Sequence, residues 1–160
     1  MASASATGPA ADATPVGAVL FAYDGSDLAQ FAIEQAGRQL APGRDALVLC
    51  VWQTGDVGFV PTGEQHFKAS AADEVKKAAA EVAEQGAALA RQAGFDAQSS
   101  TIEAAPTWKG IVEVAEQRGA GLIVFGSHRR SGLVGHLLGS VTDAVVAHTA
   151  IAVLIVHQPT

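Results

Sequence analysis

Residues 121–141 read GLIVFGSHRRSGLVGHLLGSV, an apolar run that leads into a segment rich in glycine. The run at 122–125 predicts a buried strand, and the segment at 127–139 predicts the loop that follows it. Connections from a strand to a helix usually take about two to six residues, so a loop of this length indicates a functional site. The loop holds two arginines, and no acidic residue occurs from 117 to 142. Glycine N–H groups and arginines ahead of a helix predict a phosphate site.

The rest of the chain alternates short apolar runs with segments of helical period, as in a parallel sheet joined by crossover helices. The five predicted strands span residues 18–23, 46–52, 97–103, 122–125 and 150–156. The predicted helices span residues 27–40 and 65–93, a stretch from about 108 to 119, and a stretch that begins at Ser140. Asp27 and Ser140 have the spacing of capping residues for the first and last helix. The third strand is polar, which suits a solvated edge of the sheet.

The composition limits the partners and the compartment. The chain has 160 residues, ten basic and sixteen acidic side chains, a net charge of -6 and one cysteine, Cys50. An acidic chain lacks the basic face that nucleic acid requires, and the longest apolar stretch, 144–156, is shorter than the ~20 residues of a membrane span. Residues 1–16 predict a disordered tail without the features of a signal peptide, followed by one domain at 17–158. A single unpaired thiol and no export signal predict a cytoplasmic protein.

The first strand ends in Ala22-Tyr23-Asp24-Gly25-Ser26. After the fourth strand, Gly126 is followed by two residues and Arg129, and then by nine residues and Gly139-Ser140. In these motifs, and over the whole length from Gly17 to His157, the chain resembles the universal stress protein family, whose signature is Gly, two residues, Gly, nine residues, then Gly-Ser or Gly-Thr. The resemblance implies an adenine-nucleotide α-hydrolase-like fold, a doubly wound parallel sheet of five strands in the order 3-2-1-4-5 with helices on both faces.

The resemblance also implies a site for ATP, with Mg²⁺ as a candidate companion ion. By position, Asp24 would contact adenine or ribose, and Val51 would lie against adenine. The residues carried over to the phosphates and ribose are Gly126, Gly139 and Ser140, with further contacts from Ser127 and Val141. Carboxylates accept hydrogen bonds from sugar hydroxyls, and backbone N–H groups donate to phosphate oxygens. A structural role is open for two of these residues, because Asp24 and Ser140 are also good capping residues.

Arg129 stands where the family signature has its middle glycine, and it leads to two hypotheses. A side chain that fills the phosphate space, or a backbone that needs positive φ, would block the site. An arginine that points outward would instead add charge-assisted hydrogen bonds to a triphosphate. With an open site, the chain would be an ATP-responsive stress protein, in which Arg129→Gly weakens binding or leaves it unaltered. With a blocked site, it would be a nucleotide-free dimeric interaction module, which the same change would convert to ATP binding.

The last predicted strand, Ala150 to Val156, is apolar throughout and would be an exposed sheet edge in a monomer. A second copy of the chain is the simplest cover, so we expect a homodimer. The sequence contains no paired metal-ligand spacing and no nucleophile motif. We therefore assign no catalytic and no metal-binding residue, and expect slow ATP hydrolysis at most, because Asp24 is the one acid placed near the site.

Overall fold

The computed structural model describes residues 16–54, 65–128 and 138–159. These residues form nine elements in chain order: β1 (Ala18–Ala22), α1 (Asp27–Gln39), β2 (Asp45–Trp52), α2 (Gln65–Gln92), β3 (Asp96–Glu103), α3 (Thr107–Gln117), β4 (Ala120–His128), α4 (Ser140–His148) and β5 (Ala152–Gln158). The strands form one parallel sheet in the order β3-β2-β1-β4-β5. The predicted fold class and strand order are confirmed, and the polar third strand is an edge strand.

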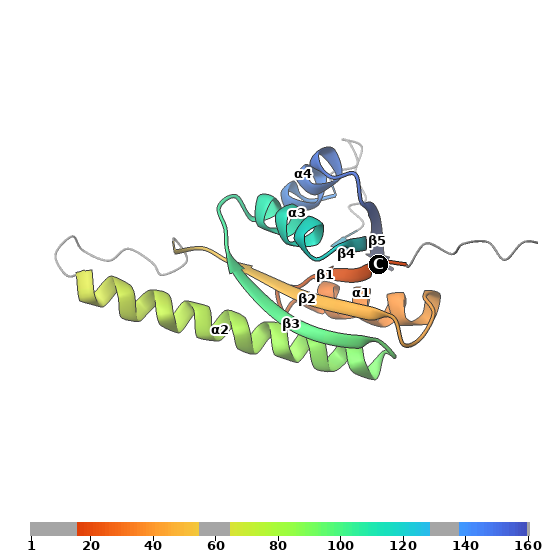
Figure 1. The fold of residues 1–160 in the computed structure, drawn as a ribbon, viewed down its shortest axis with the longest axis horizontal. Coiled ribbons are helices and arrows are strands. Elements are labelled where there is room, and N and C mark those ends of the chain that lie inside the picture. Colours follow the sequence, from red (N-terminus) through yellow and green to blue (C-terminus); the bar gives the residue numbers. More distant parts are fainter. Residues whose placement is uncertain (1–15, 55–64, 129–137, 160) are drawn as a thin grey trace, which may run out of the picture.

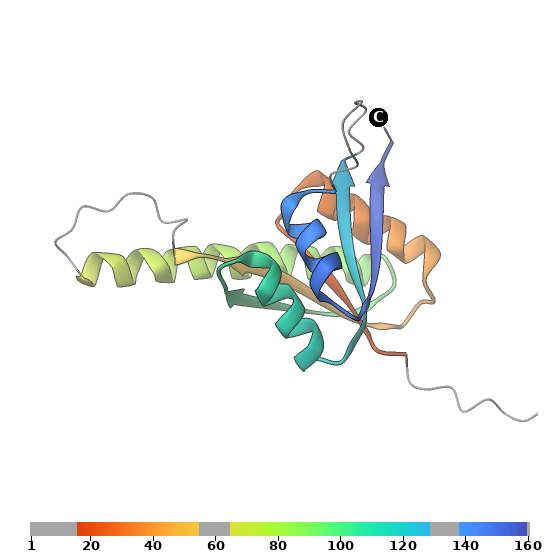
Figure 2. The ribbon, with the colours of Figure 1, turned by 90° about the horizontal axis from the view of Figure 1, so that it is seen from above.

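Helices cover both faces of the sheet, α1 and α2 on one side and α3 and α4 on the other (Figures 1 and 2). The alternation of side chains along β1 explains this arrangement. Val19 and Phe21 belong to the core cluster on the side of α1 and α2, whereas Leu20 belongs to the cluster on the side of α3 and α4. All three are almost fully buried. A central strand that is covered on both faces requires the near-continuous apolar run that the sequence shows.

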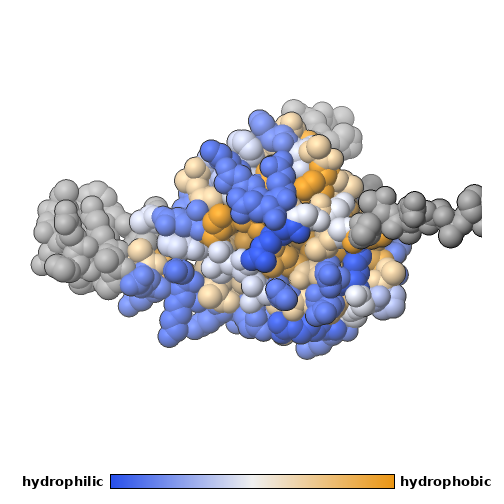
Figure 3. All heavy atoms as spheres, in the orientation of Figure 1, coloured by the Kyte–Doolittle hydropathy of each residue, from blue (hydrophilic) through white to orange (hydrophobic). Residues whose placement is uncertain are grey.

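Helix α2 packs on the sheet through small side chains. Four of its buried residues are alanines spaced three or four residues apart, as one face of a helix requires: Ala79, Ala83, Ala87 and Ala90. Val82 and Leu89 lie beside this stripe and are partly buried. The outer side of α2 is covered by hydrophilic residues, and apolar residues are visible between the two helix layers (Figure 3). No helix of the described residues is long and apolar enough to span a membrane.

The bounds of two strands, β4 and β5, differ from the prediction by two residues or more. Strand β4 runs from Ala120 to His128, so Gly126 and Ser127 belong to the strand and not to the loop. The extension is stabilised by pairing with β5, where Gly126 lies opposite Val156 and the register continues to His128. Strand β5 begins at Ala152 instead of Ala150, because the Thr149 hydroxyl accepts a hydrogen bond from the Ile151 N–H and holds the preceding residues in a turn.

Both predicted helix caps are wrong by one residue. Ser26, not Asp27, caps α1, and its Oγ accepts the Ala29 N–H at 3.3 Å. Gly139, not Ser140, is the N-cap of α4 and has a φ of 107°. Serine and aspartate are almost equally good caps, so adjacent candidates are hard to separate by residue type. Position 139 is fixed by its left-handed backbone, which glycine adopts at little cost.

Candidate functional site

A cavity of about 220 Å³ opens at the carboxyl ends of β1, β2 and β4, between the sheet and the layer of α3 and α4. Four of the predicted site residues line it: Asp24, Val51, Gly126 and Val141. They come from the ends of three strands and from the first turn of α4. This is the edge of a parallel sheet at which doubly wound proteins bind their ligands. Sequence elements that are far apart in the chain therefore meet at one concave site.

The end of the cavity next to β2 is apolar. Leu49 and Val51 face it from β2, and Ile111 closes it from α3. Phe125 of β4 is also in the lining and is only 6% exposed. Leu49, Ile111 and Phe125 belong to the buried core cluster on this side of the sheet, so the wall is rigid. A flat apolar group would fit against these side chains.

The loop after β1 supplies polar groups to the same cavity. Asp24 is exposed, and its Oδ1 accepts the backbone N–H of Ser26 at 3.0 Å. Ser26 then caps α1 with its own side chain. The structural role predicted as an alternative for Asp24 is therefore present, since it holds the turn before the helix. That bond uses one oxygen of a carboxylate that has two, each with its own lone pairs, so Asp24 retains acceptor capacity at the cavity.

The first turn of α4 forms the opposite end of the cavity, next to β4. Val141 and Thr142 lie in the lining, and Thr142 is only 6% exposed. The N-cap residue Gly139 makes no side-chain cap bond to this helix. The N–H groups of a first helical turn have no partner within the helix, and the positive end of the helix dipole lies there. This end of the cavity favours an anionic group.

Gly126 has a packing role that the sequence did not reveal. A Cβ at this position would lie 2.6 Å from the carbonyl carbon of Leu28, and closer still to its oxygen. Glycine is thus needed where the first turn of α1 crosses β4. The prediction explained Gly126 by a ligand; the structure gives a packing reason that holds without one.

Three other predicted site residues, which the structure does describe, are not among those that line the cavity. Ser127 is buried, and its Oγ donates to the carbonyl oxygen of Leu138 at 3.0 Å. Gly139 and Ser140 are exposed and adjoin the lining residue Val141. Arg129 lies outside the described residues. Their roles in binding remain predictions.

Several lining residues escaped the sequence analysis as site residues. Thr107 and Ile111 come from α3, and Leu28 and Ala29 come from the first turn of α1. Ile111 carried a signal, because it fell on the apolar stripe of its helix, but that signal indicates core packing. Thr107 carried none, because the sequence does not tell which polar residue at a helix start faces a ligand.

Two titratable side chains, Tyr23 in the cavity lining and Cys50 in the core, are buried and suited to packing. Cys50 is 8% exposed on the α2 side of β2, and burial, with a smaller contribution from the nearby Asp24, raises the pKa of its thiol. The pKa of the Tyr23 hydroxyl is also raised, chiefly by burial. Both groups stay neutral near pH 7, and an uncharged thiol is a poor nucleophile. Among the described residues, no cluster of three or more His, Cys, Asp or Glu side chains could hold a metal ion.

The sheet order places the chain in the doubly wound α/β class, and its cavity lies at the strand ends where proteins of this class bind ligands. The model of the universal stress protein family matches residues 16–157. Universal stress protein YxiE of Bacillus subtilis is 33% identical over 149 residues, which cover 87% of this chain and 97% of that protein. The chain belongs to the universal stress protein family.

Solved structures share the fold. The structure of hypothetical protein MJ0577 has a TM-score of 0.73 at 22% identity, over 92% of this chain and 99% of that one. A universal stress protein in complex with cAMP has a TM-score of 0.60 at 22% identity, over 90% and 98% of the two chains. A universal stress protein family protein from Arabidopsis thaliana with AMP bound has a TM-score of 0.62 at 16% identity, over 90% and 93%. The shared architecture is the adenine-nucleotide α-hydrolase-like fold.

Proposed function

We propose that this chain binds an adenine nucleotide, with ATP as the cellular ligand, in the cavity at the carboxyl ends of β1, β2 and β4. The observation that carries the proposal is the cavity itself, which has an apolar wall at the end of β2 and, next to β4, the N-terminal turn of α4, whose N-cap residue is a glycine. Two proteins of the same fold support the choice of ligand, because their structures contain cAMP and AMP.

The layout of the cavity follows the order of the strands. Strands β2 and β4 flank β1, so their ends lie about two strand spacings, or ~10 Å, apart. In the proposed complex, the base lies against Val51 and Phe125, the ribose hydroxyls donate to Asp24, and the phosphates meet the first turn of α4. The ligand thus follows the polarity of the site, from apolar to positively polarised.

The cavity is large enough to enclose only part of a nucleotide. Sites that enclose a drug-sized ligand usually measure about 300–1,000 Å³, whereas this cavity measures about 220 Å³. A base with its ribose would occupy the cavity, and the phosphates would extend past Val141 towards Gly139 and Ser140. In this arrangement the signature residues carry the end of the ligand that lies outside the cavity.

The proposal also includes a homodimer that responds to the bound nucleotide. Strand β5 is an edge strand, and its side chains from Val153 to Val156 are half-buried. A second copy pairing along this edge would cover them, and would make the protein a homodimer whose contacts respond to the bound nucleotide. We assign no catalytic residue and expect ATP hydrolysis to be slow at most. In this proposal the protein works in the cytoplasm, where reducing conditions suit the lone thiol of Cys50.

Thermal unfolding with added nucleotide tests the proposal. A ligand at 100 times its Kd adds about 2.7 kcal/mol to the free energy of unfolding, so millimolar ATP or AMP should raise the melting temperature. Parallel samples with GTP and with sodium sulfate show whether adenine is required and whether an anion alone suffices. A perchloric acid extract of the freshly purified protein checks for nucleotide retained from the cell. No shift with ATP or AMP, together with an extract that contains no nucleotide, contradicts the proposal.

One observation favours the second candidate, a nucleotide-free interaction module. The packing of Gly126 against Leu28 explains one signature glycine without a ligand, so the glycine pattern alone is weaker support for phosphate binding. This candidate predicts no stabilisation by ATP in the native chain and a new stabilisation in the Arg129→Gly variant. The two candidates are thus separated by the same thermal measurement on two proteins.

A further inference from the structure

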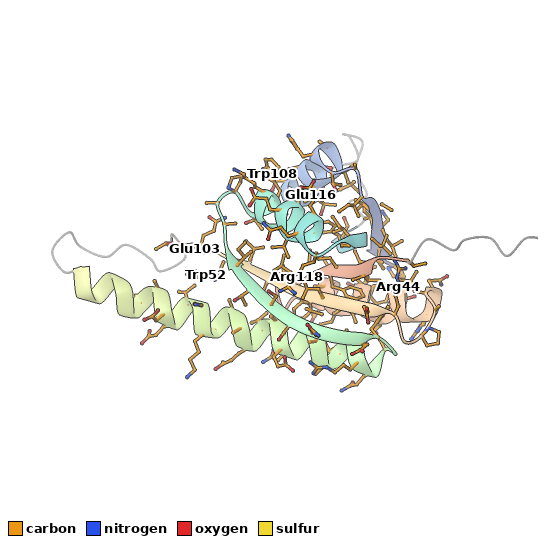
Figure 4. The ribbon with its side chains drawn as sticks, in the orientation of Figure 1. Arg44, Trp52, Glu103, Trp108, Glu116 and Arg118 are labelled. Carbon is orange, nitrogen blue, oxygen red and sulfur yellow. The ribbon has the colours of Figure 1, made fainter. Side chains whose placement is uncertain are left out.

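A side-chain hydrogen bond joins β2 to α3 at the apolar end of the cavity. Gln53 directly follows β2, and its Nε2 donates to Oγ1 of Thr107 at 2.9 Å. Thr107 is the first residue of α3 and lines the cavity. The two residues are 54 positions apart in the chain, so the bond forms only in the folded protein. Nearby Trp52, Glu103 and Trp108 lie at this end of the sheet (Figure 4).

The surroundings hold both residues in place. The next residue, Thr54, donates its hydroxyl to Glu103 at the end of β3, which fixes the chain after β2 from the other side. On α3, a Cβ at Gly110 would lie only 3.6 Å from Cγ1 of Val51, so the first turn of this helix lies directly against the strand end. Thr107 is one turn before Ile111, and both residues contact the cavity.

The direction of the hydrogen bond determines whether the Thr107 hydroxyl can donate to a ligand. Because the Gln53 amide donates, the Thr107 oxygen accepts, and the hydroxyl proton is left for another acceptor. Gln53 is the hydrogen-bond partner of this hydroxyl among the described residues. A hydroxyl with an unused proton at the edge of an apolar wall suits an aromatic base with an acceptor nitrogen in its ring. A bound base would shield the hydroxyl from water, and a base without an acceptor at this point would leave the hydroxyl unpaired at a cost in free energy. The hydrogen bond therefore selects for bases that have an acceptor there.

We propose that Thr107 donates a hydrogen bond to a ring nitrogen of the bound base, and that Gln53 is the positioning residue that directs the Thr107 hydroxyl. This inference rests on the proposed nucleotide function and adds to it the group that recognises the base. Thr107 acts on the base end of the ligand and has no role at the phosphates. Gln53 acts on the base through Thr107.

The first experiment compares AMP with ribose 5-phosphate, which lacks the base, by calorimetric titration or by competition against AMP. In Thr107→Val, the hydroxyl is replaced by a methyl of similar size, so we expect AMP to bind about 5- to 10-fold more weakly. The affinity for ribose 5-phosphate should stay within twofold of the wild-type value. Thr107→Ser keeps the hydroxyl and is the matched control, with an AMP affinity near wild type. Thermal unfolding of each free variant confirms that the fold is intact.

The second experiment tests the positioning role. In Gln53→Glu, a carboxylate replaces the amide donor, so the Thr107 hydroxyl would donate to Glu and turn away from the ligand. We expect a loss of AMP affinity similar to that of Thr107→Val. In the double variant the two losses should not add, because both changes remove the same hydrogen bond.

The outcomes separate this inference from the proposed function. If wild type binds AMP and Thr107→Val binds it equally well, the inference is overturned and the nucleotide function stands. If Thr107→Val weakens AMP and ribose 5-phosphate by the same factor, Thr107 shapes the cavity without recognising the base, and the inference also fails. Additive losses in the double variant exclude the positioning role of Gln53. If wild type binds no AMP, both proposals fall.

Discussion

The backbone at Gly126 lies directly against the carbonyl group of Leu28. A Cβ on Gly126 would lie 2.6 Å from the Leu28 carbonyl carbon, a separation that side chains do not adopt. This contact joins the carboxyl end of β4 to the first turn of α1 at the floor of the cavity. The position of α1, and with it the turn that holds Asp24, depends on the absence of a side chain at residue 126.

Gly126→Ala should therefore lower the stability and alter the cavity. The added methyl must displace backbone atoms of α1, and overpacking of this kind costs about 1–3 kcal/mol of unfolding free energy. Urea unfolding, read by circular dichroism, measures the loss. An unfolding free energy within about 0.5 kcal/mol of wild type would contradict the packing role. Under the proposed function, the affinity of this variant for AMP should fall as well, because α1 contributes Leu28 and Ala29 to the cavity lining.

Gly139 tests a different requirement of the backbone. Its φ is 107°, and an added Cβ would meet no atom of the described residues within 4 Å, so Gly139→Ala strains the backbone without a clash against them. We expect a loss of about 1–2 kcal/mol in unfolding free energy and a weaker affinity for AMP, since this residue begins α4. Gly43→Ala is the matched control, because Gly43 also has positive φ and open space but lies between α1 and β2. If Gly43→Ala lowers the AMP affinity to the same extent, the loss in Gly139→Ala is a general effect of backbone strain and does not show a role of Gly139 at the site.

Glu84 should contribute a small acid-sensitive stabilisation. Its carboxylate accepts bonds from Arg91 at 2.8 Å and from Ser99 at 2.6 Å, and these bonds, that from Arg91 first, lower its pKa from the usual 4.5. A lowered folded-state pKa gives stability that is full above the unfolded-state value and is lost as pH falls through the folded-state value. The stability of Glu84→Gln should thus change less with pH below 4.5 than that of wild type. Glu81→Gln, at an exposed position of the same helix, is the control. Equal acid slopes for Glu84→Gln and wild type would count against the prediction.

The edge of β5 gives a prediction about assembly. Ile155 lies in the middle of this strand and is half-buried in the single chain. If a second copy covers the edge, Ile155→Lys should place charge in the interface and shift the protein from dimer to monomer. Light scattering after size-exclusion chromatography measures the mass. Ala150→Lys, at an exposed residue before the strand, should leave the dimer intact. A wild-type protein that elutes as a monomer at every concentration refutes pairing along β5.

The architecture could be predicted from the sequence because its signals are local and repeated. Each buried strand is an apolar run of its own, and each helix has an apolar stripe of the right period. The polar third strand marked an edge of the sheet in advance. The end of β4 could not be predicted in the same way, because Gly126 and Ser127 resemble loop residues and only their pairing with β5 makes them part of a strand.

The site was predicted less completely than the fold. Asp24, Val51, Gly126 and Val141 were named from the family pattern, and the structure brings all four to one cavity. The Gln53–Thr107 bond could not be predicted, because it depends on the relative positions of β2 and α3. Gly126 shows a further difficulty, since a glycine needed for packing and one needed for a ligand look the same in a single sequence.

The hydrogen bond from Ser127 to the carbonyl oxygen of Leu138 has a consequence for protein engineering. It joins β4 to the residue two positions before α4, across 11 positions of the chain. The entropic cost of a closed segment grows only slowly with its length, by about 0.6 kcal/mol per doubling. A change in the number of residues between Ser127 and Leu138 should therefore cost little stability, provided that this hydrogen bond is kept.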